Sequence, residues 1–432
     1  MKTRVPRTDT LSNGLLLGWS ENGEANAPSP IWDTGREGHL LTIAPTGGGK
    51  GISCAIPALL TWRGPAIVVD PKGENYAVTA ERRRQMGHLV HRLDPFRVAG
   101  DDIGDSLNPM DLIDPNDDCF EDNAAVVAKL CMQEHASLQD PFWDERATAM
   151  IVAVICELFR VLKRQPTLKD VQEAIKGAPV SDDFPHSLQE AMEAHDAEKP
   201  KQRGISLRHV ITSSEFSSDK TRASIMATAH AHMGFLRSPA VHASLTSSTI
   251  PLDDITAGAM QTIYIILPPD KLITHGKLLR LWIGVMIAAI ARRKRAPQQP
   301  TLFLIDETAQ LGSMSELRTA LTLMRSYGMR VWTFWQDLSQ LKAIYPKDWE
   351  SIINNSAVQQ YFGAKSPPAC KALGKFLGNA YPDTGIPDDN QLLFNGRHIA
   401  MVKRPNYLLD QVFKGLAAPH PFHTPLPQLL LH

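Results

Sequence analysis

The sequence predicts an α/β protein whose mostly parallel sheet carries a phosphate-binding loop and receives an inserted all-α domain. Three observations support this prediction. A glycine-rich loop that ends in lysine follows an apolar run at residues 40–44, and a second apolar run ends in two acidic residues at 306–307. Predicted strands and helices also alternate on both sides of a long helical stretch. Such alternation favours a doubly wound sheet, because each crossover helix packs on one of its faces.

The strands are predicted from short apolar runs bounded by glycine, proline or polar residues, because buried parallel strands read as continuous apolar, β-branched stretches. The predicted strands are residues 40–44, 66–70, 89–93, 262–267, 301–306, 329–335 and, as a further candidate, 357–362. Helical patterns predict helices at 49–60, 275–293 and 315–327 around this sheet. Residues 1–35 show little periodicity and predict an arm or a short edge hairpin.

The middle of the chain breaks the alternation near Pro115. Helices are predicted there at 121–131, 143–162, 167–176, 187–194 and 219–236. We therefore expect an N-terminal arm at 1–36, a first part of a nucleotide-binding domain at 37–114, an all-α insertion domain at 115–236, and the second part of the nucleotide-binding domain at 237–432.

The glycine loop is the strongest functional signal. It consists of Thr46, Gly47, Gly48, Gly49, Lys50 and Gly51. Backbone N–H groups of such a loop bind phosphate oxygens, and the lysine at its end reaches the β- and γ-phosphates. The pattern departs from G-x-x-x-x-G-K-[ST] at Ala44 and at Gly51, and the missing hydroxyl at Gly51 would normally bind Mg²⁺. An ordinary glycine-rich turn is the alternative interpretation.

The second apolar run supplies the acidic partners of this loop. At the end of the strand at 301–306, Asp306 is the expected Mg²⁺ ligand, and Glu307 is the expected general base that activates water. Buried strands often end in an acid that caps the next helix, so this motif gains weight only from its pairing with the loop. Together the two motifs predict ATP and Mg²⁺ as cofactors and ATP hydrolysis as the reaction.

Two further polar residues complete the predicted site. Arg325 lies near the end of the predicted helix 315–327, close to the sheet edge, where an arginine can reach the γ-phosphate on a neighbouring subunit. Gln336 ends a strand in the crevice where ligands of α/β sheets bind, and could sense the γ-phosphate or position water. A surface arginine and an ordinary strand-end glutamine are the alternatives. The segment 70–74 also ends a strand on the same rim, but its spacing assigns it no catalytic step.

Composition sets limits on other functions. The net charge of −1 gives no overall field toward nucleic acid or anionic lipid, so such contacts would come from local patches or from an assembled ring. Five scattered cysteines without a C-x-x-C pair predict buried free thiols in a reducing compartment. The longest apolar stretches, 147–162 and 278–291, are shorter than the roughly 18–20 residues that span a bilayer, and we expect them to be core helices.

Several short motifs follow one another along residues 40–407. They are Ala44-Pro45-Thr46-x-x-Gly49-Lys50-Gly51, Asp70-Pro71-Lys72-Gly73-Glu74, Leu107-Asn108-Pro109, Leu304-Ile305-Asp306-Glu307, Tyr327-Gly328-x-Arg330, Gln336, Gln340-Leu341 and the segment 402–407. This ordered set resembles the TraG-like family of type IV secretion coupling proteins, the ATPases of conjugative DNA transfer. The resemblance implies a RecA-like P-loop NTPase core that assembles as a homo-hexamer. It also implies that a loop ending in Lys-Gly is normal for the family, so that Asp306 and water carry more of the Mg²⁺ shell.

The resemblance further implies ATP-driven delivery of DNA-protein (relaxosome) or protein substrates to a type IV secretion channel. The expected partners are DNA, a relaxase or effector protein, and channel components. Family members usually begin with transmembrane helices, and this sequence shows no such pattern. We therefore expect a soluble form at the cytoplasmic face of the bacterial inner membrane, attached through a separate membrane-anchor subunit. Two alternatives stay open: a stand-alone DNA translocase of a mobile element or defence system, and a nucleotide-binding substrate adaptor with little hydrolysis.

Overall fold

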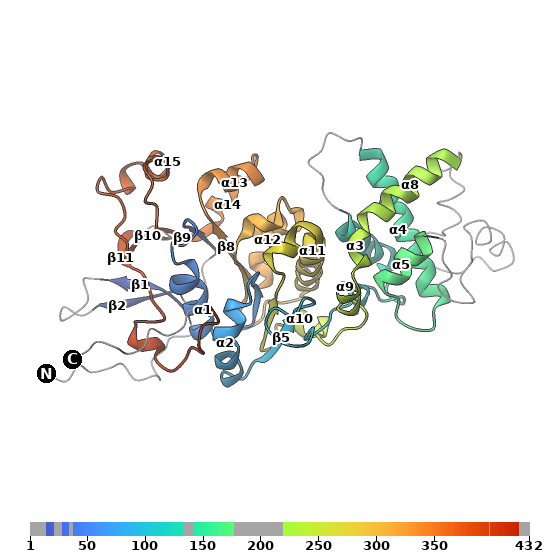
Figure 1. The fold of residues 1–432 in the computed structure, drawn as a ribbon, viewed down its shortest axis with the longest axis horizontal. Helices are drawn as coiled ribbons and strands as arrows, with labels where there is room; N and C mark the ends of the chain where they lie inside the picture. The colour runs from blue at the N-terminus through green and yellow to red at the C-terminus, as the bar shows by residue number, and fades with distance from the viewer. Residues whose placement is uncertain are drawn as a thin grey trace. The chain divides into compact units, whose positions relative to one another are not determined.

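The computed structural model describes residues 14–20, 28–33, 38–132, 141–176, 219–396 and 398–422 (Figure 1). The chain divides into two compact units. Unit 1 comprises Met1–Asp101, Thr256–Pro269 and Ile290–His432, and unit 2 comprises Asp102–Ile255 and Asp270–Ala289. The helix predicted at 187–194 lies outside the described residues.

Unit 1 is built on an 11-stranded mixed sheet in the order β2-β1-β11-β10-β9-β3-β8-β7-β4-β6-β5. The strands are β1 (Leu15–Ser20), β2 (Ser29–Asp33), β3 (His39–Ile43), β4 (Ala66–Val69), β5 (Leu89–Leu93), β6 (Gln261–Ile265), β7 (Thr301–Ile305), β8 (Met329–Trp335), β9 (Ser356–Tyr361), β10 (Asn390–Asn395) and β11 (His398–Lys403). From β9 to β5 the strands run parallel, whereas the strands from β2 to β10 pair antiparallel. Every strand predicted from the sequence is present, and the α/β class is confirmed.

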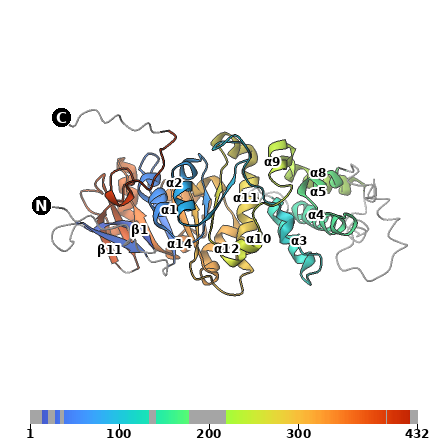
Figure 2. The same cartoon turned by 90° about the horizontal axis from the view of Figure 1, so that it is seen from below.

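The helices of unit 1 cover both faces of this sheet. They are η3 (Gly51–Ala55), α1 (Ile56–Thr61), α2 (Glu74–Gln85), η8 (Thr308–Leu311), α12 (Ser315–Leu323), η9 (Met324–Tyr327), α13 (Leu338–Ile344), α14 (Trp349–Asn354), α15 (Pro367–Leu377), η10 (Gly378–Ala380) and η11 (Gln411–Phe413). The crossovers through α1 and α2 move along the sheet in one direction, and those through α12 and α14 move in the other. Right-handed crossovers therefore place the two pairs on opposite faces, as the two views show (Figures 1 and 2).

The parallel strands owe their position to buried apolar side chains. Leu40, Val68, Leu304 and Phe334, from β3, β4, β7 and β8, are all fully buried in one hydrophobic cluster. The direction of the connections reverses between the neighbouring strands β3 and β8. The chain runs from β3 toward one edge of the sheet to reach β4, and from β8 toward the other edge to reach β9. The carboxyl edge of an α/β sheet at such a reversal is where ligands bind. The glycine loop and the acidic pair both lie at that edge.

The antiparallel edge joins the two ends of the chain. Of the two alternatives predicted for the N-terminal residues, an arm or an edge hairpin, the described residues form the hairpin: β1 and β2 pair from Leu15–Asp33 to Ser20–Ser29. Strand β1 then pairs with β11, with Trp19 opposite Lys403, so the blue and red ends of the ribbon lie side by side (Figures 1 and 2). The sequence analysis missed β10 and β11, although each holds a short apolar run, at residues 392–394 and 399–402.

Unit 2 is helical in its described residues. Its elements are η4 (Pro109–Leu112), α3 (Phe120–Cys131), α4 (Pro141–Val161), α5 (Leu168–Ile175), α8 (Asp219–His232), η7 (Gly234–Arg237) and α9 (Pro239–Ala243). Helices α10 (Leu252–Ala257) and α11 (Pro269–Ala291) each extend across a boundary between the units. By length and composition α11 could cross a membrane, but most of its apolar window is buried, which is typical of a core helix.

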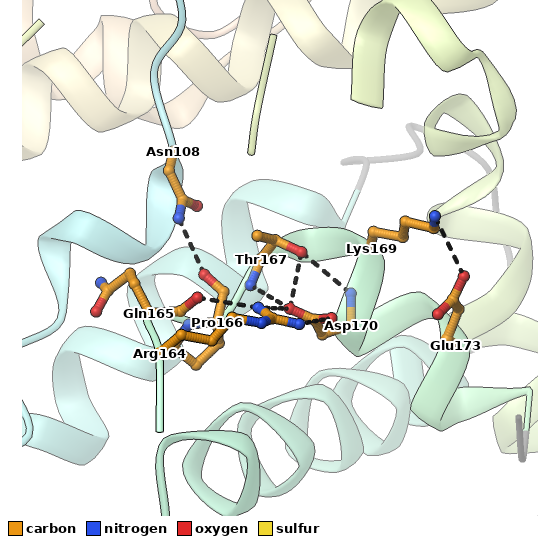
Figure 3. Close-up of polar contacts among 8 residues, drawn as sticks. All are labelled: Asn108, Arg164, Gln165, Pro166, Thr167, Lys169, Asp170 and Glu173. Atoms are coloured by element: carbon orange, nitrogen blue, oxygen red, sulfur yellow. Dashed lines mark hydrogen bonds and ion pairs between the residues drawn. The ribbon is translucent and has the colours of Figure 1, made fainter. Parts of the chain in front are cut away.

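A polar network fixes the start of α5 in unit 2 (Figure 3). Thr167 and Asp170 form a reciprocal capping box, and the Arg164 guanidinium donates two hydrogen bonds of 2.7 Å to the Asp170 carboxylate. Asn108 donates from Nδ2 to the carbonyl of Pro166 and accepts from the amide of Met110. The Leu107-Asn108-Pro109 motif therefore has a structural role, because Asn108 caps η4 and joins it to the turn before α5.

The cysteines are all free thiols, as expected. Cys54, Cys131 and Cys156 are buried, and burial raises their pKa values to about 12, 12 and 11. Cys119 is exposed and Cys370 is only partly buried, so the expectation that all five are buried is wrong at these two positions. Cys119 precedes α3, and its backbone amide donates to Asp117.

Candidate nucleotide-binding site

The glycine loop links the end of β3 to the helical turn η3. Gly47 and Gly49 adopt left-handed backbone conformations, with φ of 73° and 91°. A Cβ atom on Gly48 would lie 2.9 Å from the carbonyl oxygen of Pro45. Alternating right- and left-handed residues form the backbone nest that turns amides toward an anion, and the following helix start adds positive potential. The three glycines are therefore required by the loop itself.

Lys50 extends from this loop toward the acidic strand end. Its Nζ atom donates to the carbonyl oxygen of Ala44 at 2.9 Å and lies 3.9 Å from Oε2 of Glu307. The lysine side chain is 11% exposed and the glutamate side chain 22%. Both charges are thus largely withdrawn from water. Their attraction is therefore stronger than it would be on an open surface.

Glu307 has an unusual backbone and a tightly held side chain. It is one of two non-glycine residues with positive φ in the described part of the chain, at φ 60° and ψ 60°. Its Oε1 atom accepts hydrogen bonds from Nε2 of Gln336 at 2.9 Å and from Nε2 of Gln340 at 3.3 Å. Strained conformations of this kind persist where neighbouring contacts hold them, and they gather at functional sites. The sequence predicted Glu307 and Gln336 here, but it gave Gln340 no role.

Asp306 lies beside this pair at the end of β7. Burial raises its pKa to about 6, Lys50 lowers it, and the carboxylates of Glu307 and Glu74 raise it. A divalent cation would relieve this accumulation of negative charge. Among the described residues, no three His, Cys, Asp or Glu side chains gather closely enough to hold a metal by themselves. The single carboxylate of Asp306 nevertheless suits Mg²⁺, because this ion commonly binds through one or two carboxylates, with phosphates and water completing its shell.

The segment 70–74 lies on the same edge at the end of β4. Asp70 is buried and accepts hydrogen bonds from the amide of Tyr76 and from Nδ2 of Asn75. Burial raises the pKa of Asp70 to about 7, and Asp306 contributes to the rise. Asp70 therefore fixes the start of α2 rather than presenting a carboxylate to solvent. Oε1 of Glu74 lies 3.6 Å from Nζ of Lys72.

Arg325 does not join the other predicted site residues within one chain. It lies in η9, just before β8, and its side chain is exposed. Strand β8 begins opposite Thr301 of β7, so Arg325 lies at the amino edge of the sheet. Its charge lowers the pKa of His39, which lies at the start of β3 on the same amino edge. Arg325 and the carboxyl-edge cluster therefore lie at opposite edges of the sheet.

Two arginines of the sequence motifs have specific structural contacts. Arg330 is buried and donates to the carboxylate of Asp33 at 2.5 Å and to the carbonyl of Gly38, which fixes the amino edge of the sheet. Arg404, in the segment 402–407, donates from Nη1 to the carbonyl of Gly48 in the glycine loop at 2.5 Å. The sequence analysis missed this second contact, because it joins positions 356 residues apart.

The comparisons with known proteins agree with this geometry. The model of the protein family described as type IV secretory system conjugative DNA transfer matches residues 2–381 of this chain. The conjugal transfer protein TraG of Escherichia coli is 24% identical over 398 residues, 88% of this chain and 60% of that protein. A TraG protein of Agrobacterium fabrum is 30% identical over 318 residues, 71% of this chain and 45% of that protein. This chain thus spans about half the length of the relatives it matches.

Solved structures show the same fold. The bacterial conjugative coupling protein TrwBΔN70, in complex with sulphate, superposes with a TM-score of 0.65 at 16% identity, covering 86% of this chain and 85% of that chain. TrwB in complex with ADP and Mg²⁺ also has a TM-score of 0.65, at 15% identity, covering 87% and 86%. Because the family model matches most of the sequence, the chain belongs to the family of type IV secretory system conjugative DNA transfer proteins.

Proposed function

We propose that this chain is an ATP-hydrolysing coupling protein that recruits DNA-protein or protein substrates and delivers them to a type IV secretion channel. The observation that carries the proposal is the convergence of Lys50, Glu307 and Gln336 at the carboxyl edge of the parallel sheet. Phosphoryl transfer to water requires a cation beside the phosphates and a group that positions the attacking water. Lys50 supplies the cation, and Glu307, held by the amide of Gln336, supplies the second group.

Each residue of the site has a distinct role in this proposal. The backbone of residues 46–51 and the ammonium group of Lys50 hold the phosphates of ATP. Asp306 is the protein ligand of Mg²⁺, which neutralises charge on the phosphate oxygens when bound. Glu307 accepts a proton from the attacking water through a carboxylate oxygen. Gln336 orients that carboxylate and lies where it could contact the γ-phosphate.

The cofactor assignment is supported by structural relatives. TrwB has been solved in complex with ADP and Mg²⁺ and with the non-hydrolysable ATP analogue ADPNP. The residues of this site fit the same ligands, because the loop offers an anion-binding backbone and Asp306 offers a carboxylate with a raised pKa. ATP and Mg²⁺ are accordingly the proposed cofactors.

The proposed assembly is a homo-hexamer in which Arg325 of one protomer reaches the nucleotide of the next. Its exposure at the amino edge of the sheet supports a role in trans. The proposed substrates are a relaxase with its DNA or an effector protein, carried by the all-α domain at 115–236 between the nucleotide-binding segments 37–114 and 237–432. We place the assembly at the cytoplasmic face of the bacterial inner membrane, in contact with channel components.

The test is steady-state ATP hydrolysis over a protein concentration series, with and without single-stranded DNA. Activity that rises steeply with concentration and DNA, and that Glu307→Gln abolishes, would support an assembling motor. An Arg325→Ala variant should lose activity only at concentrations where wild-type protein oligomerises. DNA translocation in cells that lack every component of the secretion channel would favour a stand-alone translocase. Nucleotide-dependent substrate capture without any hydrolysis would favour an adaptor and contradict the motor.

A further inference from the structure

Arg404 connects the C-terminal strands to the glycine loop. It follows β11, and its backbone amide donates to the carbonyl of Asp389 at 2.8 Å. Its guanidinium donates from Nη1 to the carbonyl of Gly48 and from Nη2 to the carbonyl of Asp388. The same guanidinium lies over the ring of Phe362, 4.6 Å from the ring centroid. Arg404 is therefore fixed on three sides, with one of its nitrogens on the loop.

The loop carbonyl that Arg404 contacts lies between the two left-handed glycines. A nest turns its N–H groups toward an anion and leaves carbonyl groups facing away from it. The Gly48 carbonyl receives a charge-assisted hydrogen bond on this outer side, and such bonds are stronger than those between neutral groups. A Cβ atom on Gly49 would lie 3.2 Å from Nη1 of Arg404, so the positive charge also lies close to the loop backbone.

Burial makes the position of this charge costly. Arg404 is half-buried, and burial lowers the pKa of its guanidinium. Its Nε atom is buried without a hydrogen-bond partner, and the carboxylates of Asp388 and Asp389 offset only part of the effect of burial on its pKa. A cation that is partly desolvated, and whose nearby carboxylates do not fully compensate for that loss of solvation, is attracted to any anion bound nearby. The nearest built anion site is the loop itself.

We propose that Arg404 is a positioning residue for the phosphates of the bound nucleotide: through the Gly48 carbonyl it holds the loop in its anion-binding shape, and its charge supplements that of Lys50. The inference rests on the proposed function of the loop. It also gives the antiparallel C-terminal strands a role at the site, because they fix the guanidinium from outside the parallel sheet.

The test measures binding of ADP with Mg²⁺ by calorimetry, beside the thermal unfolding temperature of each variant. Arg404→Gln should weaken ADP binding about tenfold, which is the loss expected for one charge-assisted contact near the ligand. Arg404→Lys should recover part of that loss, because lysine keeps the charge but not the planar fork. In steady-state hydrolysis, Arg404→Gln should raise KM about tenfold and leave kcat within about twofold.

Arg293 offers a matched control. It also donates to backbone carbonyls, those of Tyr327 and Gly328 at 3.0 and 3.1 Å, but it does so at the amino edge of the sheet. Arg293→Gln should lower the unfolding temperature and leave the Kd for ADP unchanged. If Arg404→Gln behaves in the same way, Arg404 is only structural and the inference is wrong.

Lys50→Ala separates failure of this inference from failure of the proposed function. If Lys50→Ala loses ADP binding while Arg404→Gln binds ADP as wild type does, the nucleotide site stands and the role of Arg404 is refuted. If Lys50→Ala binds ADP as tightly as wild type, the loop is not a phosphate site, and both proposals fall.

Discussion

Lys50 and Glu307 come from strands that are not neighbours in the sheet, yet Nζ of the lysine lies 3.9 Å from Oε2 of the glutamate. Strand β8 separates β3 from β7, and the two side chains meet above its end. Gln336, the residue that follows β8, donates to the other carboxylate oxygen of Glu307. Three adjacent strands therefore contribute one residue each to a single polar cluster, which makes the role of each residue separately testable.

Replacing Lys50 with alanine should lower ATP hydrolysis about a hundredfold or more, because the ammonium group stabilises charge on the phosphates in the transition state. The measurement is phosphate release by purified protein. Lys169→Ala is a suitable control. Lys169 is an exposed lysine of unit 2, and its Nζ atom also lies near a carboxylate, 3.7 Å from Oε1 of Glu173. Full turnover in Lys50→Ala would show that the loop does not act in hydrolysis.

Replacing Glu307 with glutamine should leave ATP bound but unhydrolysed. Loss of a general base costs about 10²- to 10⁴-fold in rate, whereas phosphate binding depends on Lys50 and the loop. The trapped nucleotide can be measured by filter binding with labelled ATP. Glu350→Gln, at an exposed position on α14, should behave as wild type. A Glu307→Gln variant with wild-type turnover would remove Glu307 as the base.

Gln340 should matter for turnover, although the sequence assigned it no role. It donates to Oε1 of Glu307 at 3.3 Å and accepts from the backbone amide of Gln336 at 2.8 Å. Gln340→Ala should therefore reduce kcat by about three- to tenfold, the effect of one positioning hydrogen bond, and leave ATP binding intact. Equal losses in kcat and in ATP affinity would contradict an action through Glu307 alone.

The predictability of the fold follows from where the apolar residues lie. The central parallel strands, β3, β4, β6, β7 and β8, are buried on both faces, so β4 reads as an uninterrupted Ala-Ile-Val-Val run and was predicted from sequence. Strand β11 is mostly exposed, and its pairing with β1 depends on contacts between the two ends of the chain. No local sequence pattern encodes a contact between residues so far apart along the chain.

The candidate site shows the same division. Lys50, Asp306 and Glu307 stand in local motifs whose chemistry is readable from residue type and spacing. The left-handed backbone of Glu307 and the contact between Arg404 and Gly48 depend on tertiary packing, and the sequence gives no sign of either. Motifs thus located the chemical groups, whereas the residues that orient them required the structure.

His39 should make stability depend on pH at the amino edge of the sheet. It is buried, accepts from the amide of Val331 at 3.0 Å, and faces the charges of Arg330 and Arg325. Burial first, and then these two arginines, lower its pKa from 6.5 to about 4. The folded-state pKa is depressed, so the unfolded chain binds the proton more readily. The stability is fully present above pH 6.5 and is lost as the pH falls toward about 4.

This shift corresponds to at most about 3 kcal/mol of unfolding free energy. Urea unfolding, followed by circular dichroism across that pH range, measures it. A His39→Gln variant should show a flatter pH dependence than wild type. His398→Gln, at an exposed position on β11, should keep the wild-type slope. Identical slopes for all three proteins would show that His39 is not the titrating group.

Gly51 stands where the nucleotide-binding pattern has a hydroxyl, and the structure has room for one. An added Cβ atom would meet no other atom within 4 Å, and Gly51 does not adopt a left-handed conformation. Gly51→Ser should therefore fold normally. If the hydroxyl reaches the metal, the Mg²⁺ concentration that gives half-maximal hydrolysis should fall about three- to tenfold, as expected for one added oxygen ligand.

Gly51→Ala is the matched control for this prediction. It adds the same Cβ without the hydroxyl, and it removes the same glycine flexibility at the helix start, so any gain from a stiffer backbone appears in both variants. A lower Mg²⁺ requirement in the serine variant alone would assign the effect to the hydroxyl, and would place the metal beside Asp306 and residue 51. An equal change in both variants would show that the loop conformation, and not metal coordination, responds at this position.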